Sequence, residues 1–88
     1  MTDDMRRIIN ILVDWLMLKG QDADLIFDCQ TCISIASAED EHSQRLVFAL
    51  ALALGLEESA VTEYLRSAEG RIRLAELLER CRKVFINS

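Results

Sequence analysis

The side chains with the most reactive chemistry in this chain are three cysteines and one histidine. Cys29 and Cys32 form a CxxC pair, whereas Cys81 and His42 stand alone. A CxxC pair performs thiol–disulfide exchange where it opens a helix, because the helix dipole lowers the pKa of one thiol. Here the hydrophobic pattern places the pair in the middle of a predicted helix, with both sulfurs on its apolar side. We therefore predict reduced thiols that pack as small hydrophobic groups.

The same residue types could also bind zinc. A Cys₃His site would use Cys29, Cys32, Cys81 and His42, but structural zinc sites combine two short ligand pairs, and this chain has one. His42 has no serine or cysteine nucleophile at a recognisable spacing. The three glycines form no phosphate-binding loop, and the acidic run 39–41 lacks the alternation of a calcium loop. The sequence therefore predicts no enzyme activity, no metal and no cofactor.

The composition indicates a small, acidic, apolar-rich globular protein. The chain has 88 residues, of which 51% are hydrophobic, and a net charge of −5. This length predicts a single helical domain over residues 1–88. Arginine and lysine are spread over all segments, which argues against nucleic acid as a partner. No secretory signal is visible, and the longest apolar run is roughly half of a membrane span, so we expect a cytoplasmic protein without membrane insertion.

Breaks in the hydrophobic pattern divide the chain into five predicted helices. They cover about residues 2–18, 22–35, 38–54, 57–67 and 69–85, with no proline anywhere. Gly20 and Gly55 are placed to be left-handed caps at helix ends, and Ser37 is placed to cap the third helix. The short connections predict an all-α fold of antiparallel helices, stacked as helical hairpins. Such a stack is either a closed bundle or a short solenoid, and no internal repeat decides between them.

Two of these helices are apolar on more sides than a small core covers. The run 46–54 is hydrophobic on every face of its predicted helix. The first helix has polar residues only on one narrow side, namely Arg6, Arg7, Asn10 and Asp14. A helix of this kind is either buried or awaits a partner, and both interpretations stay open. The candidate partner-binding residues are Ile8, Leu12, Trp15 and Leu16 on the first helix, and Leu46, Leu50, Ala53, Val61 and Leu65 along a groove across later helices.

Three short motifs resemble one protein family. Asp14-Trp-Leu-Met-Leu-Lys-Gly20 resembles the "EWLxLKG" helix end of the TPR-like type III secretion needle chaperones, the larger partner of the needle chaperone pair. Ala53-Leu-Gly-Leu56 resembles the family's "LGLG" helix end, and Gly70-Arg-Ile72 resembles its "PRI" helix start. The motifs are short and fall within residues 10–83. The chain departs from the family in being shorter, without its N-terminal helix and one inter-helix segment.

The resemblance implies a cytoplasmic chaperone of bacterial protein transport and virulence. In that family a curved TPR-like stack holds the C-terminal amphipathic helix of the needle subunit in an apolar groove, and a small helical co-chaperone keeps the stack folded. The implied partners are therefore a needle-subunit protein and a small helical co-chaperone. Two alternatives remain: a small helical adaptor or anti-activator that sequesters a transcription factor, and a homodimeric helical bundle.

Overall fold

Helices account for nearly all of the chain that the structure describes. The computed structural model describes residues 3–19 and 27–87, with the side chains of 16–19 left out. The helices are α1 (Asp3–Lys19), α2 (Cys29–Ser37), α3 (Glu41–Leu54), α4 (Glu58–Arg66) and α5 (Ala68–Asn87). No strand occurs within these two ranges. The predicted all-α fold is confirmed.

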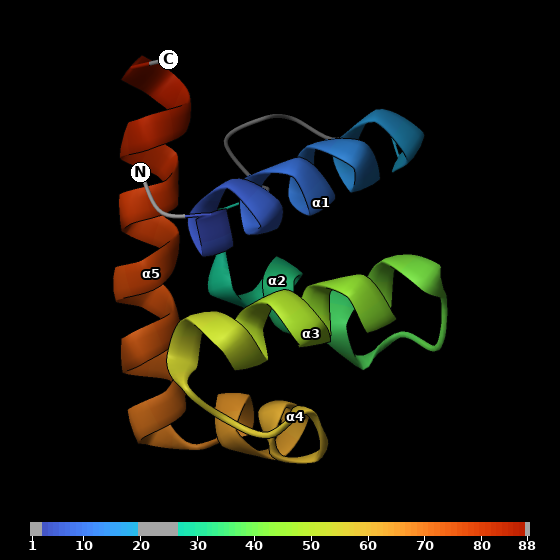
Figure 1. Ribbon diagram of the computed structural model, residues 1–88, viewed down its shortest axis with the longest axis vertical. Helices are drawn as coiled ribbons and strands as arrows, with labels where there is room; N and C mark the ends of the chain where they lie inside the picture. Colours follow the sequence, from blue (N-terminus) through green and yellow to red (C-terminus); the bar gives the residue numbers. More distant parts are fainter. Residues whose placement is uncertain (1–2, 20–26, 88) are drawn as a thin grey trace.

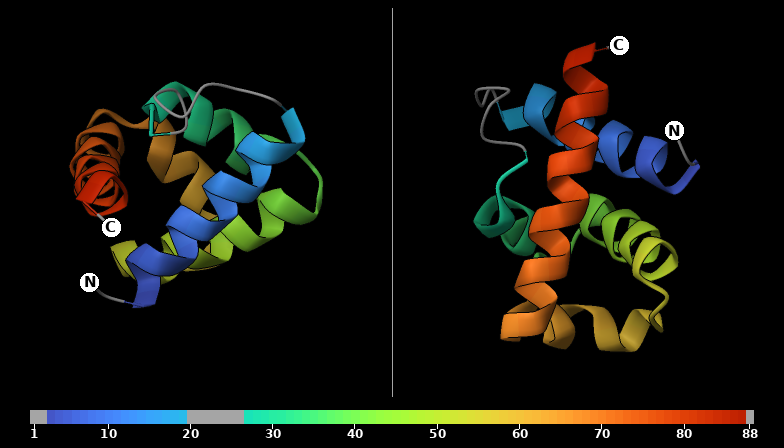
Figure 2. Two further views of the ribbon diagram at one scale, coloured as in Figure 1. Left: turned by 90° about the horizontal axis from the view of Figure 1, so that it is seen from above. Right: turned by 90° about the vertical axis from the view of Figure 1, so that its left-hand side faces the viewer.

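The helices pack in crossing directions. In Figure 1, α1 lies along α3 and runs in the opposite direction, α4 closes the lower end, and α5 stands across the ends of the others. Seen from above, α2 and α5 lie on the same side of α1 (Figure 2). Consecutive helices are therefore not all antiparallel, and a TPR-like stack of hairpins is not confirmed.

The helix α2 begins later than the sequence pattern predicts. Asp28 is its N-cap, and a carboxylate oxygen of Asp28 accepts a hydrogen bond of 3.2 Å from the backbone N–H of Thr31. The predicted start near residue 22 and the predicted cap Gly20 lie outside the described residues. The CxxC pair consequently opens the helix instead of lying in its middle, which corrects the prediction. An aspartate at the N-cap satisfies a backbone donor that the helix itself leaves unpaired.

The helix α3 is capped at both ends by residues visible in the sequence. Asp40 accepts a 2.8 Å hydrogen bond from the backbone N–H of Ser43, so the predicted cap at Ser37 is wrong, and Ser37 is instead the last residue of α2. Gly55 adopts the left-handed conformation with φ of 71°, as predicted, and the N–H of Leu56 returns to the carbonyl of Ala51 at 2.9 Å. These caps fix where the apolar helix starts and stops.

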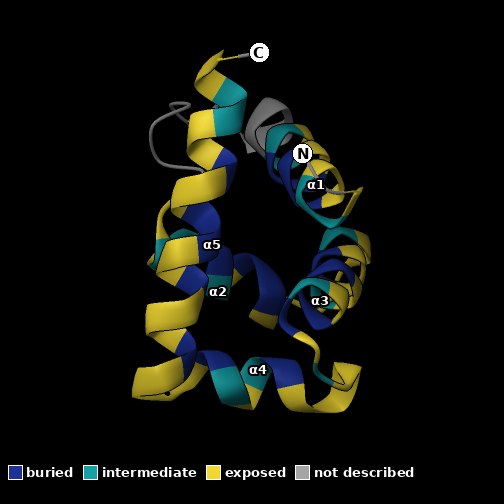
Figure 3. Ribbon diagram, turned by 60° about the vertical axis from the view of Figure 1, so that its left-hand side comes forward, coloured by how far each residue is buried: buried dark blue, intermediate teal, exposed yellow. Residues whose placement is uncertain are grey.

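All five helices contribute to one core. Figure 3 shows the buried side of α3, α4 and α5 turned inward and the exposed side turned out. The largest fully buried side chains are Ile8, Leu12, Cys32, Leu46, Leu50, Val61, Leu65, Leu74, Leu78 and Cys81. Among the described residues, no helix is both long and apolar enough to cross a bilayer.

A tight joint between α4 and α5 sets the crossing direction of α5. Only Ser67 separates the two helices, and its hydroxyl accepts a 3.0 Å hydrogen bond from the N–H of Gly70 while donating one of 2.6 Å to the carbonyl of Tyr64. A Cβ atom on Gly70 would lie 1.8 Å from that same carbonyl oxygen. Glycine is required here because the end of α4 touches the first turn of α5.

Arg73 ties this joint to the end of α3. Its guanidinium donates hydrogen bonds to the hydroxyl of Tyr64 at 3.2 Å and to the carbonyl of Leu54 at 3.3 Å. The same group lies over the Tyr64 ring, 5.8 Å from its centroid. The last carbonyls of a helix lack partners within it, so Arg73 satisfies one of them. Hydrogen bonds from Arg73 on the surface therefore connect α3, α4 and α5, in addition to their contacts in the core.

Candidate partner-binding surface

The structure places most of the predicted partner-binding residues in the core. Leu46, Leu50, Val61 and Leu65 have no exposed surface, and neither do Ile8 and Leu12. The predicted groove across α3 and α4 is filled in the structure, because these residues are buried where α1, α2 and α4 pack against α3. Ala53 and Trp15 are partly buried against the same core. The side chain of Leu16 lies outside the described residues.

The outer side of α3 is the part that stays uncovered. Phe48 and Leu52 are each 47% exposed and lie one helical turn apart. Residues at i and i+4 share a helix face, so together they form a continuous apolar strip on the surface. The prediction that five short helices cannot cover every side of this helix is confirmed. The exposed apolar surface of α3 is therefore this strip and not the buried leucines.

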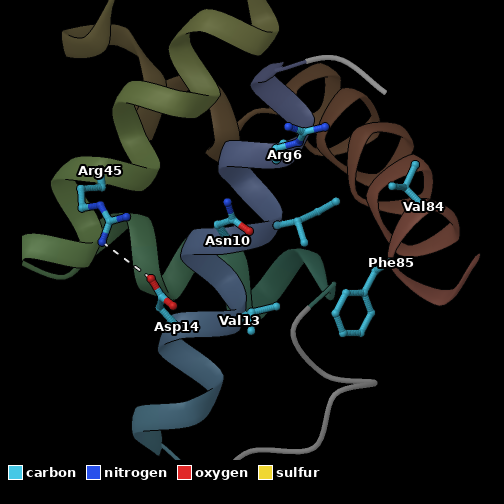
Figure 4. A pocket seen from close by; sticks show the side chains of 8 residues that line it. Arg6, Asn10, Val13, Asp14, Arg45, Val84 and Phe85 are labelled. Carbon is cyan, nitrogen blue, oxygen red and sulfur yellow. Dashed lines mark ion pairs between the residues drawn. The ribbon is translucent and has the colours of Figure 1, made fainter. Parts of the chain in front are cut away.

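Two hollows flank α1, and the smaller one borders the exposed strip. The larger has a volume of about 660 Å³ and lies between α1 and the C-terminal part of α5 (Figure 4). Its apolar side chains are Ile9 and Val13 from α1 and Val84 and Phe85 from α5. Phe85 is held in place by the ring of Phe27, with centroids 5.5 Å apart. Figure 4 shows the Phe85 ring across an open space from Val13.

The smaller hollow lies between α1 and α3. It has a volume of about 390 Å³ and is lined by Arg7, Asn10, Ile11, Arg45, Phe48 and Ala49. Asn10 and Arg45 line both hollows, so the two are neighbours separated by α1. We call the residues that line the two hollows, together with Leu52, the α1–α3 surface.

The α1–α3 surface is basic although the protein is acidic. Its charged residues are Arg6, Arg7 and Arg45 against one aspartate, Asp14, which leaves seven basic and fourteen acidic residues for the rest of the chain. Arg45 pairs with Asp14 at 3.9 Å, with both side chains about half exposed, and such pairs contribute little to stability. Within residues 3–19 and 27–87, neither Arg6 nor Arg7 forms an ion pair. Three of the four charged side chains that line the two hollows are therefore basic.

Cys32 and Cys81 are buried thiols and Cys29 is partly buried, although the CxxC pair opens a helix. Burial raises the pKa of Cys32 to about 12 and that of Cys81 to about 11. Burial, joined by the Asp28 carboxylate, also raises the pKa of Cys29 against the opposing effect of Arg71. A thiol must ionise to attack a disulfide or bind a metal. All three are free thiols, and no cluster of three or more metal-binding side chains occurs in the described residues.

Alkaline pH should destabilise this protein through Cys32. The folded state holds the Cys32 proton to a pKa of about 12, against 9.0 for an ordinary thiol. Stability is therefore unaffected below about pH 9, and it falls above that value because the unfolded chain releases its proton first. Urea unfolding at about pH 8 and about pH 10 should show this loss, and Cys32→Ala should make the loss smaller. An equal loss in both proteins would show that Cys32 is not its source.

The α1–α3 surface is not predicted from the sequence, although several of its residues are noted there. Arg6, Arg7 and Asn10 were recognised as the narrow polar side of the first helix, but as solvated residues only. Arg45, Phe48 and Leu52 follow the i, i+3, i+7 spacing of one helix face, which was hidden by the leucines and alanines around them. The available signal was that aromatic and basic residues share this face.

The comparisons with known proteins give no further identification. No protein-family model, no curated protein sequence and no solved structure matches the chain.

Proposed function

We propose that this protein binds the amphipathic helix of another protein and keeps that protein from assembling. The specific form proposed is a cytoplasmic chaperone of type III secretion that sequesters a needle subunit together with a small helical co-chaperone. The proposal assigns no catalytic step, metal or cofactor to the chain. Helix-in-groove recognition reads apolar side chains at i, i+3, i+4 and i+7 of the bound helix.

The observation that carries the proposal is the exposed strip of Phe48 and Leu52 at the edge of the smaller hollow. A helix rich in leucine and alanine exposes large apolar side chains at a cost in hydration, and a bound helix would remove that cost. Aromatic side chains set among near-neutral neighbours often dominate the binding energy of an interface. Phe48 lines the smaller hollow and is half exposed, which suits it to contact a partner.

The choice of a secretion chaperone within this class rests on the three sequence motifs. Gly55, in the second motif, ends α3 in the left-handed conformation, and Gly70, in the third, lies in the first turn of α5. Both glycines therefore occupy helix ends, as the corresponding motifs do in the needle chaperones. The crossing direction of α5 differs from a hairpin stack, so the proposed binding surface is the α1–α3 surface and not a concave groove.

Co-expression with the small neighbouring genes, followed by purification, tests the proposal. We expect a complex that contains a small helical protein of the needle type. The variant Phe48→Asp/Leu52→Asp should remain folded and lose this complex, because two charges would face the apolar side of the bound helix. Ile72→Asp is the control for an added charge at an exposed apolar position elsewhere, since Ile72 lies at the start of α5.

Three results would count against the proposal. The chain could purify alone, it could purify with a DNA-binding protein, or the Ile72 variant could lose the complex as readily as the α3 variant. Purification with a DNA-binding protein would favour the sequestering regulator instead.

A further inference from the structure

We infer that the partner helix is acidic and lies across α1, with its apolar side chains in the two hollows and its carboxylates on Arg6, Arg7 and Arg45. This inference rests on the proposed function and specifies the chemistry of the partner. It comes from two observations that coincide: apolar hollows on both sides of one helix, and arginines at the edges of both.

The shape of the surface fits a helix that presents two apolar side chains. Asn10 lies on α1 between the hollows and lines both of them. A helix placed over it could insert one side chain toward Ile9 and Val13 and another toward Ile11 and Phe48. Side chains at i and i+7 lie about 10 Å apart along one face of a helix, which is about the width of α1, so a single helix face provides such a pair. The amide of Asn10 would then face the backbone or a polar side chain of the partner.

The charges of the surface select an acidic partner. Arg6 and Arg45 line the larger hollow, and Arg7 and Arg45 line the smaller one. Figure 4 shows Arg6 and Arg45 on either side of Asn10, with Asp14 turned toward Arg45. The third hollow of the described structure, on the other side of α3, contains Glu58 and no arginine. Opposite charge across an interface speeds association and excludes partners of like charge.

The same charges argue against a second copy of this chain as the occupant. In a two-fold symmetric dimer each surface meets itself, so the three arginines of each copy would be brought into one interface. A nucleic acid would be attracted to these arginines, but it would also approach a protein whose other residues carry fourteen acids against seven bases. Neither occupant would use the apolar hollows and the Phe48 and Leu52 strip as well as an acidic helix does.

Two designed peptides test the inference. Both are blocked helices of about 18 residues with leucines at i, i+4, i+7 and i+11, and they differ only in carrying glutamate or lysine at the flanking positions. Titration calorimetry with the full-length chain should show the glutamate peptide binding at least about tenfold more tightly than the lysine peptide at low salt. The difference should shrink as salt is raised, because exposed charges are screened.

Variants connect the charge preference to named residues. Arg6→Glu/Arg7→Glu should reduce the affinity for the glutamate peptide by about tenfold or more and improve binding of the lysine peptide. Arg66→Glu/Arg71→Glu changes the net charge equally at exposed positions of α4 and α5, so it should alter either affinity less than about threefold. Circular dichroism of both variants verifies that they are folded.

The outcomes separate this inference from the proposed function. Equal binding of both peptides, abolished by Phe48→Asp/Leu52→Asp, would overturn the acidic partner and leave helix binding intact. Binding of neither peptide would count against both. Dimerisation that Arg6→Glu/Arg7→Glu alters, or tight binding of a fluorescent duplex DNA at the same arginines, would replace the acidic helix by those occupants.

Discussion

Gly70→Ala should lower the free energy of unfolding by about 3 kcal/mol or more. A Cβ atom at this position would lie 1.8 Å from the carbonyl oxygen of Tyr64 and 3.0 Å from the hydroxyl of Ser67. The first contact is with backbone, so α4 and α5 must move apart to relieve it. A protein of this size has about 4–13 kcal/mol of stability in total, so the variant should unfold at a much lower urea concentration than the parent.

Gly55→Ala is the matched control for this prediction. It is the same chemical change at a helix end, and an added Cβ there meets nothing within 4 Å. Its cost comes only from the left-handed backbone, about 1–2 kcal/mol. Urea unfolding followed by circular dichroism gives both values. If Gly70→Ala costs no more than Gly55→Ala, the close approach of α4 to α5 is not present in solution.

Leu50→Ala should cost about 2–5 kcal/mol of stability and leave the affinity of the folded protein for a partner helix unchanged. Leu50 has no exposed surface, so truncating it leaves a cavity among the helices that cover it. This is the opposite of the result expected if Leu50 lined a groove, in which case binding would weaken and stability would change little.

Leu52→Ala supplies the comparison two residues further along α3. Leu52 is half exposed, so its truncation should cost less than about 1 kcal/mol of stability while weakening the binding of an acidic helix. Calorimetry and urea unfolding on both variants complete the test. A Leu50→Ala protein that keeps its stability and loses affinity would restore the groove that the sequence predicted.

Local signals in the sequence were sufficient to locate most helices. Gly55 ends α3 where the pattern places it. Both α4 and α5 begin and end within two residues of the predicted positions. Capping was harder, because Ser37 and Asp40 are both good N-caps three residues apart. The structure uses Asp40, whose carboxylate accepts the Ser43 N–H, while the Ser43 hydroxyl donates to the carbonyl of Ala36 at 2.8 Å.

The candidate site could not be predicted because it depends on contacts between distant segments. Leu50 and Leu52 stand in the same run of leucine and alanine, and nothing local distinguishes the buried one from the exposed one. The distinction arises when α1 packs along one side of α3 and α2 covers another. The arginines of α1 and Arg45 of α3 meet for the same reason. Only the spacing of Arg45, Phe48 and Leu52 was available beforehand.

Hydrogen exchange on the chain alone and in its co-expressed complex tests the central claim most directly. The claim is that a partner helix binds the α1–α3 surface while the core stays closed. We predict that amides of residues 6–14 and 45–52 exchange more slowly in the complex, while those of 58–74 do not change. Protection confined to residues 58–74, or faster exchange around Leu46 and Leu50 as the core opens to admit the partner, would contradict it.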